Sequence, residues 1–194
     1  MNGSLILCPE NPLSDFSDTS ALEALLTELS LIAEGIAGEI AGNIMGGEEK
    51  RFYCGDNFVQ LITFMGCSPH LVFEPPADGS DNFCHVKIQT SKQPVLFTGQ
   101  QTAPPRCPSC RFRIADWKND IDNWIKKPVT SQWQCPKCEN LCSPVELDWR
   151  QSGGGAKTWV EITNIFPGEA VPVDLLMSKL KALSGENWRY FYLV

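Results

Sequence analysis

Two short turns, Cys107-Pro108-Ser109-Cys110 and Cys135-Pro136-Lys137-Cys138, contain the residues of this chain that are best suited to chemistry. In each turn a two-residue spacer places both sulfurs on one side of the backbone, and the proline fixes φ so that the turn is partly formed in advance. Two such pairs supply the four thiolates of one tetrahedral metal site. A thiolate shell with no open position favours structural zinc, although iron accepts the same ligands. We therefore predict one structural zinc ion bound by Cys107, Cys110, Cys135 and Cys138.

The segment around these turns, residues 106–142, resembles the zinc-ribbon and rubredoxin-like class of metal modules. The resemblance covers this segment only, and it implies a fold element with the four cysteines as ligands rather than an activity. The sequence differs from the commonest members of the class because Arg111 and Glu139, not glycine, directly follow the two cysteine pairs. Basic side chains near the site are placed in sequence to offset its negative charge; they are Arg106, Arg111, Arg113 and Lys137.

A second group of cysteines and histidines is formed by Cys54, Cys67, His70, Cys84 and His85. The segment from Cys67 to His70 has the spacing of metal ligands on a turn. Alternation along residues 82–89 predicts that Cys84 faces inward and His85 outward, so both cannot bind one ion, and we interpret these cysteines as small core residues. Cys67 and His70 are also a candidate thiol and base for an enzyme, although no orienting acid lies beside them.

The chain contains nine cysteines, an odd number. The five outside the two turns show no paired framework; they are Cys8, Cys54, Cys67, Cys84 and Cys142. This usage predicts a reducing, cytoplasmic environment. The first four residues lack a positively charged lead-in, and the apolar run at residues 5–7 is too short for a signal peptide or a membrane span, so neither export nor membrane insertion is expected.

Charge is unevenly distributed along this acidic chain, whose formal net charge is −7. Residues 1–49 contain nine Asp or Glu side chains and no Lys or Arg, whereas residues 50–194 contain 16 basic and 14 acidic side chains. Net negative charge repels nucleic acid and anionic membranes at long range. We interpret the acidic N-terminal part as a solvated surface rather than as a docking surface for a basic partner.

Hydrophobic patterns predict the elements that precede the cysteine turns. A strand is expected at residues 4–8, and a helix is expected to start at the capping box of residues 20–23 and to end at Gly46-Gly47. Its apolar stripe consists of Leu22, Leu25, Leu29, Ile32, Ile36 and Ile40, with three glycines in the second half that permit a break or kink. Extended segments are expected at residues 58–65, 70–73 and 82–89.

Between and after the turns, helical spacing of Trp117, Ile121, Trp124 and Ile125 predicts that the metal module has a small core of its own. Residues 145–149 and 158–165 are expected to be strands, with residues 151–155 as a flexible hairpin tip. A helix is expected at residues 175–183, capped by Asp174 and ended by Gly185, and a buried strand at residues 188–194.

This element order predicts an α+β fold with a mixed or antiparallel sheet, a few helices and an inserted zinc-ribbon module. We expect residues 1–103 and 145–194 to form the body and residues 104–144 to form the module.

Three functions are compatible with these features. The first is a non-enzymatic adaptor or regulatory protein, in which structural zinc supports a surface for a protein partner. The second is a nucleic-acid-binding protein, with Trp117 or Trp124 stacking on bases beside Arg106, Arg111, Arg113, Lys118, Lys126 and Lys127. The third is an enzyme with a thiol site at Cys67 and His70.

Overall fold

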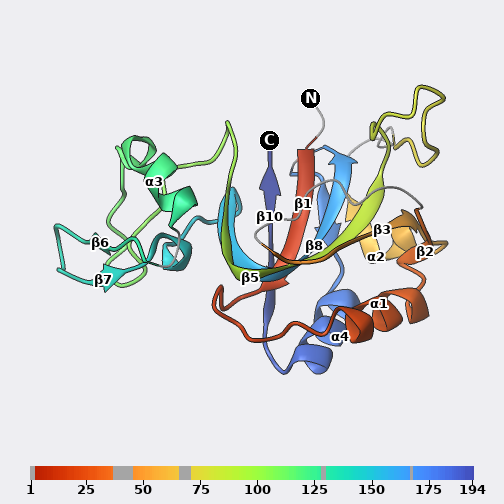
Figure 1. Ribbon diagram of the computed structural model, residues 1–194, viewed down its shortest axis with the longest axis horizontal. Coiled ribbons are helices and arrows are strands. Elements are labelled where there is room, and N and C mark those ends of the chain that lie inside the picture. The colour runs from red at the N-terminus through yellow and green to blue at the C-terminus, as the bar shows by residue number, and fades with distance from the viewer. Residues whose placement is uncertain (1–2, 37–45, 66–70, 128–129, 167) are drawn as a thin grey trace.

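A six-stranded antiparallel sheet forms the centre of the computed structural model, which describes residues 3–36, 46–65, 71–127, 130–166 and 168–194 (Figure 1). The strand order across the sheet is β10-β1-β8-β5-β3-β2. The strands are β1 (Gly3–Pro9), β2 (Ile32–Gly35), β3 (Glu49–Cys54), β5 (His85–Thr98), β8 (Gly153–Ile165) and β10 (Trp188–Leu193). The helices are segregated from the strands of this sheet, which confirms the predicted α+β class.

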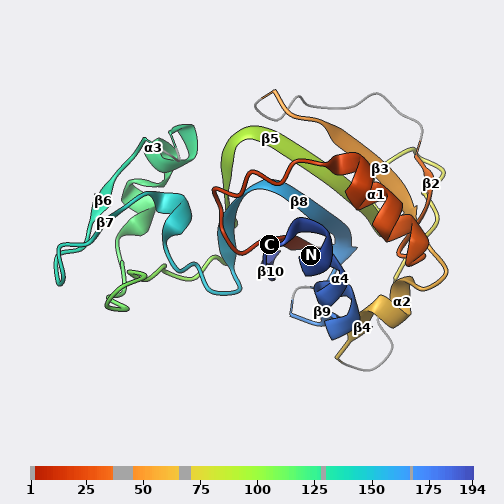
Figure 2. The same cartoon turned by 90° about the horizontal axis from the view of Figure 1, so that it is seen from below.

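Two helices, α1 (Thr19–Glu28) and α4 (Asp174–Ser184), lie on the same face of the sheet (Figure 2). Their buried leucines pack with sheet residues in one large cluster; the helical members are Leu22, Leu26, Leu176 and Leu180, and the sheet members include Leu5, Leu7, Val86, Ile88, Val160 and Ile162. Burying each leucine contributes about 1.5–3 kcal/mol. A short helix, α2 (Phe58–Leu61), and the paired strands β4 (Ile62–Phe64) and β9 (Ala170–Pro172) adjoin this core.

The opposite face of the sheet is partly covered by the sheet itself. Strands β5 and β8 bend where their register shifts between Thr90 and Val95, and Figure 1 shows both curving round beside β1 and β10. Two backbone hydrogen bonds join the C-terminal segment to the residues next to the bent ends of β5 and β8. Gln100 N donates to Val194 O at 2.8 Å, and Tyr192 N donates to Gln151 O at 3.0 Å. A second core fills the enclosed space, formed by Ile6, Cys8, Ala156, Trp159 and Phe191.

The glycine-rich segment that the sequence predicts to be a flexible hairpin tip is instead the start of β8. Gly153, Gly154 and Gly155 pair with Thr98, Phe97 and Leu96 of β5, and all three glycines are buried. The hairpin-tip prediction is wrong because these glycines serve close packing rather than a turn. A Cβ at Gly155 would lie 2.5 Å from Val145 Cβ, so only glycine fits there without displacing its neighbour.

Substituting Gly155 with alanine is therefore expected to destabilise the protein by about 1–3 kcal/mol, the usual cost of overpacking a core. Urea unfolding measures this effect, and Gly35→Ala is the matched control, because a Cβ there would meet only Arg51 O at 3.8 Å. Combining Gly155→Ala with Val145→Gly, which removes the Cβ that the new methyl group would meet, should cost less than the sum of the two single losses. An unchanged unfolding midpoint for Gly155→Ala would show that Val145 does not limit this position.

The first helix is shorter than its apolar stripe predicts. It ends at Glu28, Ser30 adopts a positive φ of 55°, and the chain continues as β2. The prediction of one helix from residue 20 onward is wrong because pairing of Ile32 with Cys54 at the sheet edge overrides the helical spacing. The N-cap is Asp18, whose carboxylate accepts a hydrogen bond from Ala21 N at 2.8 Å, and not Ser20. Residues 37–45 of the predicted helix lie outside the described residues.

Three other segments differ from their predicted structure. Residues 58–65 were expected to be extended, but α2 occupies the first half. Residues 71–73 are not a strand, and residue 70 lies outside the described residues. Residues 145–149 are not a strand either, because Pro144 starts a 3₁₀ helix, η2 (Pro144–Glu146), with a Ser143–Glu146 capping box.

The last helix, α4, and the last strand, β10, lie close to their predicted bounds, but Asp174 is the first helical residue and not the predicted cap, because the N-cap of α4 is Val173. Helix α4 is followed by Gly185 at φ 75°, the left-handed conformation that ends many helices. Strand β10 follows directly, with Trp188 and Phe191 buried. In the part of the chain that the structure describes, no helix is both long enough and apolar enough to cross a membrane.

Candidate metal centre

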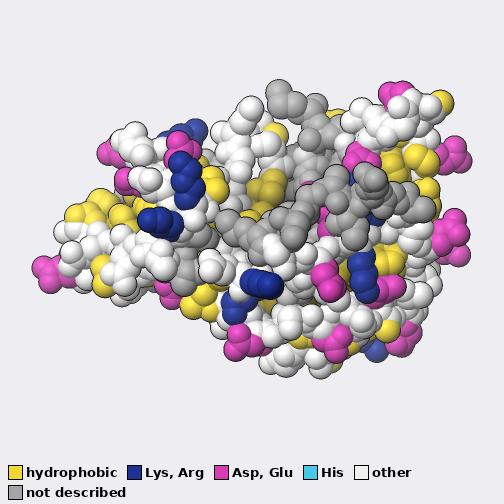
Figure 3. All heavy atoms as spheres, viewed as in Figure 1, with side chains coloured by type: hydrophobic (Ala, Val, Ile, Leu, Met, Phe, Trp, Pro, Cys, Tyr) yellow, Lys and Arg dark blue, Asp and Glu magenta, His cyan; other side chains and the backbone are white. Residues whose placement is uncertain are grey.

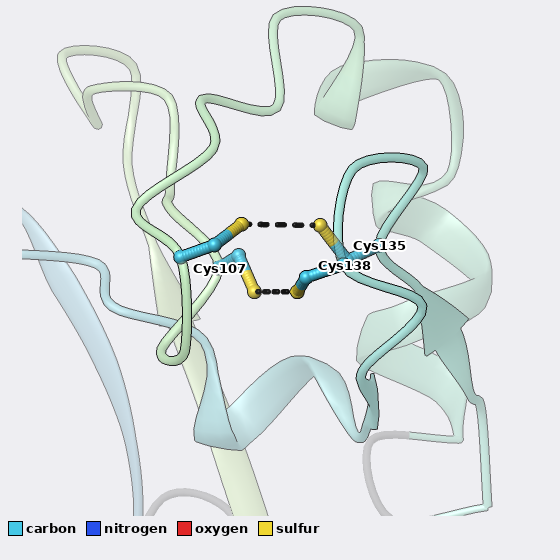
Figure 4. A group of neighbouring side chains, drawn as sticks. Cys107, Cys135 and Cys138 are labelled. Atoms are coloured by element: carbon cyan, nitrogen blue, oxygen red, sulfur yellow. Dashed lines mark hydrogen bonds between the residues drawn. The ribbon is translucent and has the colours of Figure 1, made fainter.

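The four cysteines of the two turns converge on one point. Their Sγ atoms all lie within 4.8 Å of one another, with Cys107 and Cys138 at 3.7 Å and Cys110 and Cys135 at 3.5 Å. Figure 4 shows the side chains of Cys107, Cys135 and Cys138 facing one another across the gap between the turns. A regular tetrahedron with Zn–S bonds of 2.3 Å has S–S edges of about 3.8 Å. The four thiols therefore fit a single zinc-sized ion without rearrangement of the fold.

The two turns are built alike. In each, the backbone N–H after the second cysteine donates to the carbonyl of the first cysteine, Arg111 to Cys107 at 3.0 Å and Glu139 to Cys135 at 2.9 Å. Arg111 and Glu139 adopt positive φ angles of 64° and 58°, in the region where glycine is commonest. These side chains therefore do not prevent the left-handed turn that the resemblance to zinc ribbons implies.

The backbone amides of each turn also act on the sulfurs. Burial raises the pKa of the Cys135 thiol, but backbone N–H groups of Lys137 and Cys138 stabilise its thiolate and bring the pKa down to about 7. The N–H of Asn140 lowers the pKa of Cys138, yet burial and the neighbouring thiols outweigh it and raise that pKa to about 12. Four adjacent thiolates therefore need a cation between them, which is what a divalent metal supplies.

A compact aromatic cluster supports the site. The segment contains η1 (Trp117–Asn119), α3 (Ile121–Lys126) and the paired strands β6 (Trp133–Gln134) and β7 (Leu141–Cys142). Trp149 is fully buried at the centre, with the rings of Trp117 and Trp124 edge-on to it at 5.2 Å and 6.4 Å. The remaining buried members are Leu96, Ile114, Cys142, Val145 and Leu147. Leu96 belongs to β5, so this cluster joins the segment that contains the two cysteine turns to the central sheet. The predicted module boundaries at residues 104 and 144 stay a prediction.

An ion pair ties the first turn to the segment that leads into β8. Arg111 Nη1 lies 2.7 Å from Asp148 Oδ2, and the backbones of Arg106 and Asp148 form an antiparallel bridge. The sequence predicts Arg111 near the sulfurs but gives no indication of Asp148, because no spacing signal links residues so far apart in the chain. Cys142 is buried in the aromatic cluster and is not one of the four converging thiols.

The second predicted group of ligands is only partly described. Cys67 and His70 lie outside the described residues, so the thiol site proposed for them has no structural description. Cys54 and Cys84 are close, with their Sγ atoms 3.8 Å apart. Among the described residues, the four-cysteine cluster is the one group of three or more Cys, His, Asp or Glu side chains that could hold a metal ion.

The sequence predicts that His85 faces solvent. In the structure its side chain is instead buried, with 1% of the residue exposed. Its Nδ1 lies 2.9 Å from Thr163 Oγ1 and 3.0 Å from Phe83 O. The outward prediction is wrong because the far side of β5 is covered as well, here by the Phe83 ring at a centroid distance of 4.7 Å. Burial lowers the pKa of His85, and the positive charges of Lys87 and Arg51 act in the same direction.

Because the folded state disfavours protonated His85, this residue should make the protein less stable in mild acid. The unfolded state binds the proton more readily, so stability is full above the unfolded pKa of about 6.5 and falls as the pH drops below that value. Urea midpoints measured near neutral pH and near pH 5 should therefore differ less in His85→Gln than in the unaltered protein. An equal loss in both proteins would assign the acid sensitivity to other groups.

The two tryptophans that sequence analysis proposed for base stacking are inside the aromatic cluster, where Trp117 is 3% and Trp124 is 5% exposed. Of the basic residues proposed with them, Arg111 is paired with Asp148, and Lys118 Nζ lies over the Trp117 ring at 5.6 Å. Figure 3 shows further Lys and Arg side chains on this part of the molecule. Neither tryptophan therefore exposes a ring on which a nucleotide base could stack.

Comparisons with known proteins add no family to this geometry: no protein-family model matches the sequence, and neither curated proteins nor solved structures give a match. The class that the fold and the site define is an α+β protein with a four-cysteine cluster compatible with a metal ion.

Proposed function

We propose that this chain is a zinc protein, in which Cys107, Cys110, Cys135 and Cys138 hold one structural ion. The observation that carries the proposal is the convergence of four thiols within 4.8 Å from two turns of the same construction. All four positions of a tetrahedral ion are filled by sulfur, so the ion stabilises the fold and leaves no position for a substrate. Iron would bind in the same geometry and is the less favoured metal.

We further propose that the zinc-supported segment presents a surface to a protein partner, as an adaptor or regulatory protein does. Three large apolar side chains of this segment are exposed, Phe112 at 36%, Ile125 at 41% and Leu141 at 55%. Apolar side chains that remain exposed near a rigid, metal-fixed scaffold are typical of recognition surfaces. None of the eight described cysteines is in a disulfide, which supports a reducing compartment such as the cytoplasm.

The metal is tested on untagged protein by elemental analysis and X-ray absorption spectroscopy. We expect one equivalent of zinc with four sulfur neighbours at about 2.3 Å. A full equivalent of iron would replace zinc as the ion. Absence of both metals, or oxygen and nitrogen neighbours, would overturn the proposed site.

The partner surface is tested with a photo-crosslinking amino acid placed at residue 141 or, as a matched control, at residue 175. Leu141 and Leu175 are equally exposed, at 55%, but Leu175 lies on α4, away from the metal-binding segment. We expect a protein adduct at position 141 that disappears when the metal is chelated and that is absent at position 175. Adducts to RNA or DNA at position 141 would favour nucleic-acid binding, and equal labelling at both positions would remove the proposed surface.

A further inference from the structure

Outside the metal centre, two thiols face each other across neighbouring strands. The ladder between β3 and β5 ends where Tyr53 pairs with His85. Cys54 and Cys84 are the residues directly beyond this last pair, so continuing the antiparallel register sets them opposite each other. Their Sγ atoms are 3.8 Å apart. Directly opposed residues of antiparallel strands have Cα atoms about 4.5–5.5 Å apart, which lies within the range that a disulfide spans. The two sulfurs can therefore bond after a small side-chain rotation, without movement of the backbone.

The two thiols differ in access. Cys84 is fully buried in the main core, whereas Cys54 is only partly buried. Cys54 lines a cavity of about 240 Å³ together with Gly55, Asp56, Phe58, Val59 and Phe73. A small reagent can reach Cys54 through this cavity. Cys84 is not accessible to the reagent and can react only with the sulfur of Cys54. This order is the one required of an attacking thiol and a resolving thiol.

We propose that Cys54 and Cys84 form a reversible disulfide when the protein meets a low-molecular-weight disulfide such as oxidised glutathione. The Cys54 thiolate attacks one sulfur of the reagent, which forms a mixed disulfide and releases one thiolate. The Cys84 thiolate then attacks the Cys54 sulfur, which forms the protein disulfide and releases the second thiolate. The two protons lost by the cysteines are taken up by the two released thiolates, which become thiols. The protein therefore gives up two electrons, and the reagent disulfide accepts them.

The bond would link β3 to β5 at the end of their ladder and close the loop that contains α2 and β4. Such a link restrains the unfolded chain and stabilises the edge of the sheet next to the cavity. A hydrogen bond with Cys84 and burial together raise the pKa of Cys54, so little thiolate is present at neutral pH. The first step should therefore accelerate by roughly tenfold for each pH unit while the thiol remains below its pKa.

The full-length protein is incubated with defined ratios of oxidised and reduced glutathione, alkylated in acid, digested and analysed by mass spectrometry. We expect a peptide pair linking Cys54 to Cys84 that dithiothreitol removes. Cys84→Ser should stop at a glutathione adduct on Cys54, and Cys54→Ser should leave Cys84 unmodified because it is buried. These readouts do not depend on the metal centre.

Two further variants make the assignment specific. Cys67→Ser should keep the Cys54–Cys84 link, and Cys8→Ser, which removes another fully buried thiol, should not change its rate. A link from Cys54 to any other cysteine would overturn the proposal. So would a glutathione adduct that persists on Cys54 of the unaltered protein, because the neighbouring thiol would then have failed to displace it.

Discussion

Replacing Cys107 with serine is expected to abolish binding of the proposed zinc ion and to unfold the segment that contains both turns. Cys107 is fully buried and lies 3.7 Å from the sulfur of Cys138, so no solvent ligand can take its place without opening the site. Zinc binding by finger peptides is worth about 10–16 kcal/mol at neutral pH, and much of that free energy holds the fold together. Zinc content and limited proteolysis within residues 104–144 measure the two effects.

Cys142→Ser is the matched control for this substitution. Cys142 is also buried and lies four residues after Cys138, but it belongs to the aromatic cluster and not to the four converging thiols. We expect the control to retain one equivalent of zinc and to resist protease like the unaltered protein. Loss of zinc from Cys142→Ser, or retention of zinc by Cys107→Ser, would show that the ligands have been wrongly assigned.

The convergence of the four cysteines was predictable from sequence because it depends on local geometry. Each Cys-Pro-x-Cys turn sets two sulfurs by itself, and only one long-range step, the meeting of the two turns, remains for the fold to supply. Helix α4 was predictable for the same reason, since its apolar spacing and Gly185 lie within one short segment, although its N-cap is Val173 and not Asp174.

The errors arose where partners distant in sequence decide the structure. Ile32 continues the spacing of a helix, but Cys54, which it pairs with, follows it by more than twenty residues and makes it the start of an edge strand. Gly153–155 has the composition of a loop, yet Val145 and the curled end of β5 make it a crowded strand. Side-chain pairing and packing of this kind leave no periodic signal in a single sequence.

Trp149 is the residue where these long-range effects meet. It was predicted to end a strand, but its ring is the centre of the aromatic cluster, which includes Leu96 of β5 and the tryptophans beside the metal turns. Its Nε1 donates a hydrogen bond to Pro144 O at 2.7 Å, which fixes the ring relative to η2. The Trp149 side chain therefore contacts the segment that contains the cysteine turns, the 3₁₀ helix and the central sheet, and helps to fix their relative positions.

Trp149→Ala is therefore expected to destabilise the protein by about 3–5 kcal/mol, the range for removing a large aromatic ring from a core. Trp149→Phe keeps an aromatic ring for the edge-on contacts with Trp117 and Trp124 but removes the indole donor to Pro144 O. Pro144 O keeps the longer hydrogen bond from Leu147 N at 3.4 Å, so losing the indole donor should cost about 0.5–1.5 kcal/mol. Urea unfolding with saturating zinc separates this packing effect from metal loss. If Trp149→Ala instead unfolds at the midpoint of the unaltered protein, the aromatic cluster does not couple the metal-binding segment to the sheet, and zinc alone must hold that segment in place.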